Sequence, residues 1–146
     1  MLLPATLLIS SFSEPNERSN NLNPPSEFET LLSFLETNRN FINTDAAPAL
    51  IPSDEVKKNF KNPKYHIIDI RSATWFEYGH IKNAANVQPV DLLHYFENSI
   101  VPSEYDKIIL ICYSGQSAAY FTSLLRIAGY DNTHSLNWGM SSWRVD

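Results

Sequence analysis

Cysteine is nearly absent from this sequence, in which Cys112 is the only one among 146 residues. A single cysteine cannot form a disulfide within the chain, so the fold must be held by its core. It also excludes the paired-cysteine motifs of structural zinc sites, and the four histidines are scattered along the chain. We therefore expect no metal site.

Positive charge is also sparse, with 11 Lys and Arg residues against 16 Asp and Glu and a formal net charge of −5. No Lys/Arg cluster is present, which argues against nucleic acid and against an anionic membrane surface as partners. No apolar run is long enough for a stable membrane span. The hydrophobic fraction of 43% is sufficient for one core in one domain.

The amino-terminal residues 1–25 combine a short apolar run, Leu2 to Phe12, with a polar stretch rich in Asn, Ser and Pro. The small-x-small triplet at residues 11–13 is similar to the end of a secretory signal peptide. No basic segment precedes the run, so a weak anchor and a disordered tail are the alternatives. We expect a signal remnant and flexible linker, with export to a bacterial periplasm, and a cytoplasmic location as the alternative.

Residues 26–45 are predicted to form a helical extension. Ser26 and Glu29 make a capping box, and an apolar stripe with helical spacing follows it. We expect this helix to dock on the main domain, residues 46–146, through Phe28, Leu31, Leu32 and Leu35.

The stretch from Lys107 to Gly129 contains the cysteine and organises the rest of the chain. Residues 108–111 are a β-branched-rich block suited to a buried parallel strand, and apolar residues recur at helical spacing over 118–128. Cys112 falls between them, where unpaired amides of a helix start favour a thiolate. The alternative is that Cys112 is a small buried hydrophobic residue.

Strands are also predicted at 65–70, 84–87, 133–136 and near 49–51, and helices at 53–60, 73–79, 91–96 and after Trp138. This alternation predicts an α/β fold with a central, mostly parallel sheet flanked by helices. Asp69 and Arg71 would then lie at the same sheet edge as Cys112, either binding each other and the backbone or taking part in chemistry. His80 is a candidate proton donor, or a residue that fixes its loop through its ring nitrogens.

Four segments in this order resemble the rhodanese-like domain family: IIDIRS (67–72), GHIKNAANV (79–87), IILICYSGQSA (108–118) and LRIAGYDNTHSLNWGMSSW (125–143). The resemblance implies a sulfurtransferase or sulfane-sulfur carrier that forms a persulfide on Cys112, with no metal or organic cofactor required. Its partners would be a small sulfur donor and a thiol or protein acceptor. Backbone amides would stabilise the sulfur in a loop formed by Tyr113, Ser114, Gly115, Gln116 and Ser117.

Three departures from the family pattern qualify this expectation. Tyr113 and Ser117 stand where many thiosulfate-using members carry basic residues, so the loop has no charged side chain and thiosulfate should be a poor donor. Ala118 stands where related phosphatases carry Arg, which argues against phosphate esters. Trp138 replaces a common glycine, and either walls the pocket or is a core or rim aromatic. A non-catalytic interaction module and a cysteine redox sensor are the alternative functions.

Overall fold

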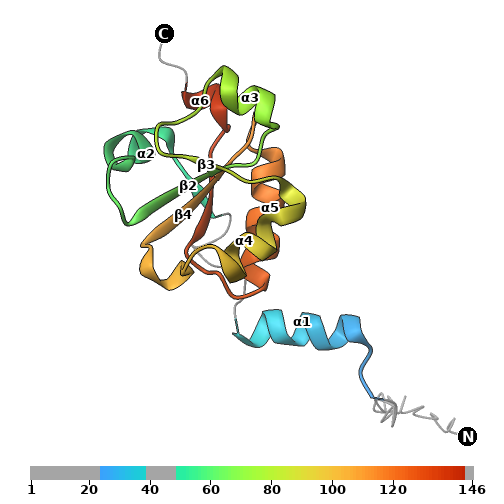
Figure 1. Ribbon diagram of the computed structural model, residues 1–146. Helices are drawn as coiled ribbons and strands as arrows, with labels where there is room; N and C mark the ends of the chain where they lie inside the picture. The colour runs from blue at the N-terminus through green and yellow to red at the C-terminus, as the bar shows by residue number, and fades with distance from the viewer. Residues whose placement is uncertain (1–23, 39–48, 144–146) are drawn as a thin grey trace, which may run out of the picture.

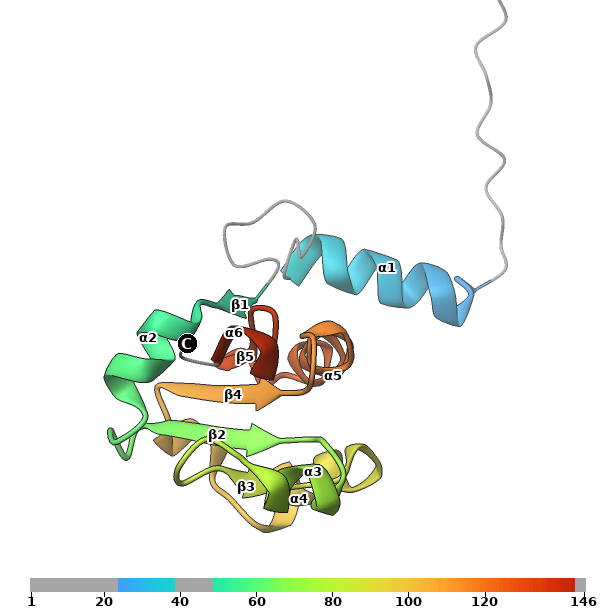
Figure 2. The ribbon, with the colours of Figure 1, turned by 90° about the horizontal axis from the view of Figure 1, so that it is seen from above.

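A five-stranded parallel sheet forms the centre of the computed structural model, which describes residues 24–38 and 49–143. The strand order is β1-β5-β4-β2-β3, which can be followed in Figure 2. All paired strands run parallel, as the alternation of strands and helices predicts. The strands are β1 (Leu50–Ile51), β2 (Tyr65–Asp69), β3 (Ala85–Asn86), β4 (Lys107–Ile111) and β5 (Thr133–Leu136).

Helices cover both faces of the sheet, with α2 on one side and α4 and α5 on the other (Figure 1). Short helices α3 and α6 lie at the end of the sheet to which the strands point (Figure 1). The main domain contains α2 (Ser53–Asn59), α3 (Ala73–Tyr78), α4 (Leu92–Asn98), α5 (Gln116–Ile127), α6 (Met140–Trp143) and the 3-10 turns η1 (Pro89–Asp91) and η2 (Pro102–Glu104).

The central strand β4 is buried on both faces. Ile108 and Leu110 pack in the core beneath α4 and α5, with Phe96 and Leu125. The alternate residues of β4, Ile109 and Ile111, pack in a second core that includes Val56 of α2. The prediction of a doubly buried strand directly before Cys112 is therefore confirmed.

The predicted amino-terminal helix is present as α1 (Glu27–Asn38). Its capping box is formed, because Glu29 N–H donates to Ser26 Oγ (3.2 Å) and Ser26 N–H donates to the Glu29 carboxylate (2.8 Å). The expected docking is wrong, since Phe28 is 71% exposed and Leu31 and Leu32 are also exposed. Caps and apolar spacing specify that a helix forms, whereas they do not specify which surface its apolar stripe meets.

Two predictions lie wholly or partly outside the described residues. The signal remnant falls in 1–23, and the second half of the helical extension falls in 39–48. No helix within 24–38 or 49–143 has the length and apolar character needed to cross a membrane.

Candidate active site

The sulfur of Cys112 lies where β4 ends and α5 begins. The Gly115 N–H donates to Cys112 Sγ at 3.2 Å, and the Ala118 N–H donates at 3.4 Å. Gly115 has a φ of +90°, a conformation that glycine adopts without a Cβ clash, and this turn aims the first amides of the helix at the sulfur. The site can therefore stabilise negative charge on sulfur through backbone dipoles.

The register between β2 and β4 brings a second segment beside the cysteine. Asp69 pairs with Ile111, and the Ile70 N–H donates to the Ile111 carbonyl at 2.8 Å. As a result, Arg71 and Cys112 both follow strand ends at one edge of the sheet.

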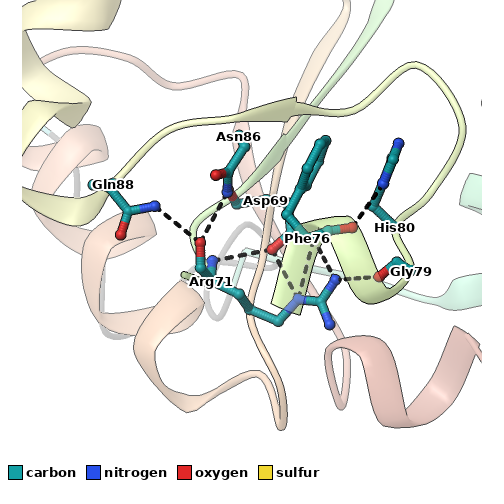
Figure 3. Close-up of polar contacts among 7 residues, drawn as sticks. All are labelled: Asp69, Arg71, Phe76, Gly79, His80, Asn86 and Gln88. Carbon is teal, nitrogen blue, oxygen red and sulfur yellow. Dashed lines mark hydrogen bonds and ion pairs between the residues drawn. The ribbon is translucent and has the colours of Figure 1, made fainter. Parts of the chain in front are cut away.

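Arg71 is held in place by its buried partner Asp69 (Figure 3). Arg71 Nη2 donates to Asp69 Oδ2 at 2.6 Å and to the Gly79 carbonyl at 2.7 Å, while Nε donates to both carboxylate oxygens. The hydrogen bonds to Asp69 raise the pKa of Arg71 above its ordinary value, and its proximity to Tyr113 and Cys112 acts in the same direction. The two residues are thus bound to each other, and Arg71 brings a fixed positive charge to the site.

Two side chains that the sequence did not single out hold the Arg71 backbone. Asn86 Nδ2 donates to the Arg71 carbonyl at 2.8 Å and to the Asp69 carbonyl at 2.8 Å. Gln88 Nε2 also donates to the Arg71 carbonyl, at 3.0 Å (Figure 3). No local sequence signal identifies these residues, because the pairing of β2 with β3 creates their contacts.

His80 is tied to the helix that precedes it. Its Nδ1 lies 2.8 Å from the Phe76 carbonyl, which can only accept, so this nitrogen carries the proton (Figure 3). The His80 ring also stacks on the Phe76 ring with 3.8 Å between centroids. Of the two roles considered for His80, this geometry favours the one that fixes the loop.

The first residues of α6 bind the backbone of the cysteine loop. The Met140 N–H donates to the Cys112 carbonyl at 2.8 Å, and the Ser141 N–H donates to the Tyr113 carbonyl at 3.1 Å. Trp138 adopts a φ of +62° and is 68% exposed. Its side chain therefore lies outside the core and does not line the cavities beside Cys112, and the left-handed backbone explains why glycine suits this position.

Two cavities open at this edge of the sheet. The cysteine cavity has a volume of about 350 Å³, and Arg71 is the only charged residue among those that line it. A neighbouring aromatic cavity of about 620 Å³ shares Arg71 and Tyr113 with it. The residues around the cysteine cavity are Ile70, Arg71, Ser72, Pro89, Cys112, Tyr113, Ser114, Ser117 and Phe121.

The sequence-predicted loop residues contribute to this site in different ways. Tyr113, Ser114 and Ser117 line the cysteine cavity, whereas Gly115 contributes its N–H group and Gln116 begins α5. The amide of Ala118 and the wall residues Pro89 and Phe121 were not predicted; the Ala118 amide could have been found by extending the loop by one helical residue. Across the described ranges, no group of three His, Cys, Asp or Glu side chains could hold a metal ion.

Comparisons with known proteins agree with this architecture. The sequence model of the rhodanese-like domain matches residues 52–146. Thiosulfate sulfurtransferase GlpE of Shewanella oneidensis is 33% identical over 78 residues, which are 53% of this chain and 73% of that protein.

Solved structures give the same fold. A rhodanese-related protein from Thermoplasma volcanium superposes with a TM-score of 0.55 at 24% identity, covering 64% of this chain and 87% of that one. The human single-domain sulfurtransferase TSTD1 superposes with a TM-score of 0.54 at 17% identity, covering 65% and 94%. At these identities, the structural likeness establishes the fold alone.

Proposed function

This chain belongs to the rhodanese-like domain family, and on that premise we propose that it transfers sulfane sulfur through a persulfide on Cys112. A sulfurtransferase-type function is supported by relatives that carry that name. The observation that carries the proposal is the pair of N–H groups, from Gly115 and Ala118, that donate to Cys112 Sγ. No other cysteine exists in the sequence to perform the reaction.

The chemistry needs only the groups already described. The Cys112 thiolate attacks the outer sulfur of a donor R–S–SH, a new S–S bond forms, and the bond from that sulfur to R–S breaks. R–S⁻ leaves, and Cys112 becomes a persulfide. Backbone N–H groups at the start of α5 stabilise the anionic sulfur before and after this step.

Release of the sulfur requires an acceptor from outside the chain. Without a second cysteine, Cys112 cannot resolve its own persulfide as an internal disulfide. A nucleophilic acceptor, either a small thiol or a protein thiol, attacks the terminal sulfur and restores the Cys112 thiolate. The cysteine cavity opens to solvent, so an acceptor can reach the sulfur.

We propose organic persulfides, rather than thiosulfate, as the better donors. Thiosulfate is a dianion, and among the described residues Arg71 is the only charged one that lines the cysteine cavity. The charge of Arg71 is already paired with Asp69 at 2.6 Å, so Arg71 can offer a hydrogen bond to a monoanion but no net charge to balance the second charge of a dianion. The name of the relative from Shewanella oneidensis makes thiosulfate the natural comparison donor.

Mass spectrometry tests the proposal directly. Wild-type protein is incubated with glutathione persulfide, polysulfide or thiosulfate, and we expect one sulfur atom to be added at Cys112 and to be released by cyanide. Cys112→Ser should add none. Failure of every donor to load the wild type, or loading of Cys112→Ser, would falsify the carrier mechanism.

Two alternative functions keep the same fold. The uncharged side chains of the cysteine loop favour a non-catalytic interaction module, which would bind a partner without loading sulfur. A redox sensor would form a sulfenic acid at Cys112, and would react with peroxide faster than with persulfides. The protein is treated with peroxide and, in parallel, with persulfide, and mass spectrometry measures what each reagent adds to Cys112. The results distinguish the interaction module and the redox sensor from the sulfurtransferase.

The domain limits at 1–25, 26–45 and 46–146, and export from the cytoplasm, remain proposals. Expression of the full chain in a bacterium, followed by cell fractionation and amino-terminal sequencing, tests both the export and the first boundary. A mature chain that begins near Glu14 supports a cleaved signal. An intact amino terminus in the cytoplasmic fraction contradicts it.

A further inference from the structure

An open cavity lined with aromatic rings lies directly beside the cysteine cavity. It is formed by α3, by α6 and by the start of the cysteine loop, and its volume is about 620 Å³. Cavities of this size hold small organic molecules. The rings around it belong to Trp75, Tyr78, His80, Tyr113 and Trp143.

Trp75 and the two rings that contact it, Tyr78 and Tyr113, remain open to solvent. Trp75 meets Tyr113 edge to face with centroids 4.9 Å apart, and meets Tyr78 edge to face at 5.9 Å. Trp75 is 46% exposed, Tyr113 43% and Tyr78 83%. Exposed aromatic side chains gathered in a concave site are typical of a surface that binds a partly apolar ligand.

Arg71 and Tyr113 connect this cavity to the reactive cysteine, because both residues line both cavities. The Arg71 guanidinium carbon lies 5.5 Å from the centre of the Tyr113 ring. Arg71 Nη1 forms no hydrogen bond to another residue within 24–38 or 49–143, although the side chain is only 6% exposed (Figure 3). A buried guanidinium with a spare N–H group at this boundary can receive the sulfur anion that leaves the donor.

We infer that the aromatic cavity holds the organic group of the sulfur donor, and that this donor is a persulfide whose organic group carries an aromatic or heteroaromatic ring. The inference rests on the proposed function and deepens it by naming the substrate class. The ring of the donor packs against Trp75 and Tyr78, while its outer sulfur reaches Cys112 past Tyr113. When the S–S bond breaks, the thiolate that carries the ring leaves beside Arg71.

Donor selectivity provides the kinetic test. Benzyl persulfide and methyl persulfide carry the same reactive group, and kcat/KM is measured for each with wild type, Trp75→Ala, Tyr78→Ala and the control Tyr120→Ala. Tyr120 is an exposed aromatic residue of α5 that lines neither of the two cavities. Intrinsic donor reactivity cancels when each variant is compared with wild type for the same donor.

We expect Trp75→Ala to lower the benzyl-to-methyl ratio of kcat/KM by roughly five- to tenfold, and Tyr78→Ala by about two- to threefold, the range for single aromatic contacts. Tyr120→Ala should leave this ratio at the wild-type value. An unchanged ratio in both cavity variants overturns the inference while the sulfurtransferase function stands. Failure of both donors to load wild-type Cys112 overturns the proposed function, and this inference with it.

Binding without reaction gives an independent measurement. Cys112→Ser protein is titrated with benzyl mercaptan and, separately, with methyl mercaptan, and the tryptophan indole N–H signals are followed by NMR. We expect a saturable shift of the Trp75 signal with benzyl mercaptan only. Equal responses to the two thiols, or a shift that never saturates, would contradict an aromatic site at this cavity.

Discussion

The backbone of Gly139 lies against the carbonyl of Cys112, so closely that a Cβ atom added to Gly139 would stand 2.4 Å from that oxygen. The same Cβ would stand 2.8 Å from the Gly115 nitrogen, whose N–H group donates to the cysteine sulfur. Gly139 also has a φ of +55°, in the region that favours glycine. The turn before α6 and the cysteine loop are therefore packed backbone to backbone, and the shape of one sets the shape of the other.

Gly139→Ala should disturb both stability and sulfur loading. The clash with Cys112 and the positive φ together should cost roughly 2–4 kcal/mol of unfolding free energy, and the loop must shift to relieve them. Chemical denaturation measures the first effect and persulfide formation the second. The matched control is Gly79→Ala, where an added Cβ meets nothing within 4 Å. Equal stability of the two variants would contradict the packing described here.

Asp69→Asn should destabilise the protein by about 3 kcal/mol or more, because it leaves the buried Arg71 guanidinium without its counter-charge. Replacing both residues, as in Asp69→Asn with Arg71→Met, should cost less than the sum of the single changes. Urea denaturation of the four proteins in this double-mutant cycle gives the coupling energy. A coupling near zero would mean that the pair does not stabilise the fold as a unit.

Ser117→Arg should improve thiosulfate as a donor. The substitution adds an unpaired positive charge to the lining of the cysteine cavity, and a dianion gains more from it than a monoanionic persulfide. We expect roughly a tenfold rise in kcat/KM for thiosulfate at low salt, which weakens as salt is added. Ser123→Arg, an exposed position later in α5, is the control for overall charge. An equal gain in the control would assign the effect to the net charge of the protein.

Stability should fall as the pH drops below the ordinary histidine range, and His66 should contribute to this loss. Burial lowers the pKa of His66, which stacks on Tyr105 and lies 3.0 Å from the Tyr95 hydroxyl through Nε2. The unfolded chain therefore binds a proton at a pH where the folded protein does not, so stability is lost from about pH 6.5 downward, towards the lower folded pKa. Burial also lowers the pKa of His134, so protonation of His134 adds to the loss of stability as the pH falls.

His66→Phe keeps an aromatic ring between the tyrosines and removes the titration. We expect the difference in unfolding free energy between pH 7.5 and pH 5.5 to be smaller in this variant than in wild type. The pH dependence that remains in the variant is due in part to His134. His94→Gln, a change at an exposed histidine of α4, is the control. If His66→Phe and wild type lose stability in parallel, protonation of His66 is not the cause.

Trp138→Gly should stabilise the protein slightly or leave its stability unchanged. Trp138 is sterically strained because its backbone is left-handed, and its largely exposed side chain buries little surface that could offset this strain. Relief of that strain is worth about 1 kcal/mol, and the greater freedom of glycine in the unfolded chain offsets part of it. Thermal denaturation would show a melting temperature no lower than that of wild type. A marked drop would reveal packing by the indole that its exposure does not suggest.

The strands, the helices and the position of Cys112 were predictable because each depends on a short segment of sequence. The apolar block at residues 108–111 and the helical spacing after it gave β4, α5 and the junction between them. The edge shared by Asp69, Arg71 and Cys112 followed from parallel strand order. These features reflect local patterns and one topological rule.

Other features depend on contacts that no local pattern encodes. Asn86 and Gln88 bind the Arg71 carbonyl only because β3 pairs with β2. The aromatic cavity brings Trp75 of α3 beside Tyr113 of the cysteine loop, and these two segments are far apart in the sequence. The apolar stripe of α1 predicts a docking face, although apolar periodicity cannot distinguish a face that packs within the chain from one that stays exposed.

The strand order β1-β5-β4-β2-β3 also determines when the reactive thiol becomes enclosed during synthesis. As the chain leaves the ribosome, β2 and β3 emerge before β4, so one edge of β2 stays unpaired until β4 arrives. Cys112 follows β4 directly, and α5, β5 and α6 emerge after it. Until α5 forms on the emerging chain, the sulfur therefore lacks the Gly115 and Ala118 N–H groups that donate to it in the folded protein.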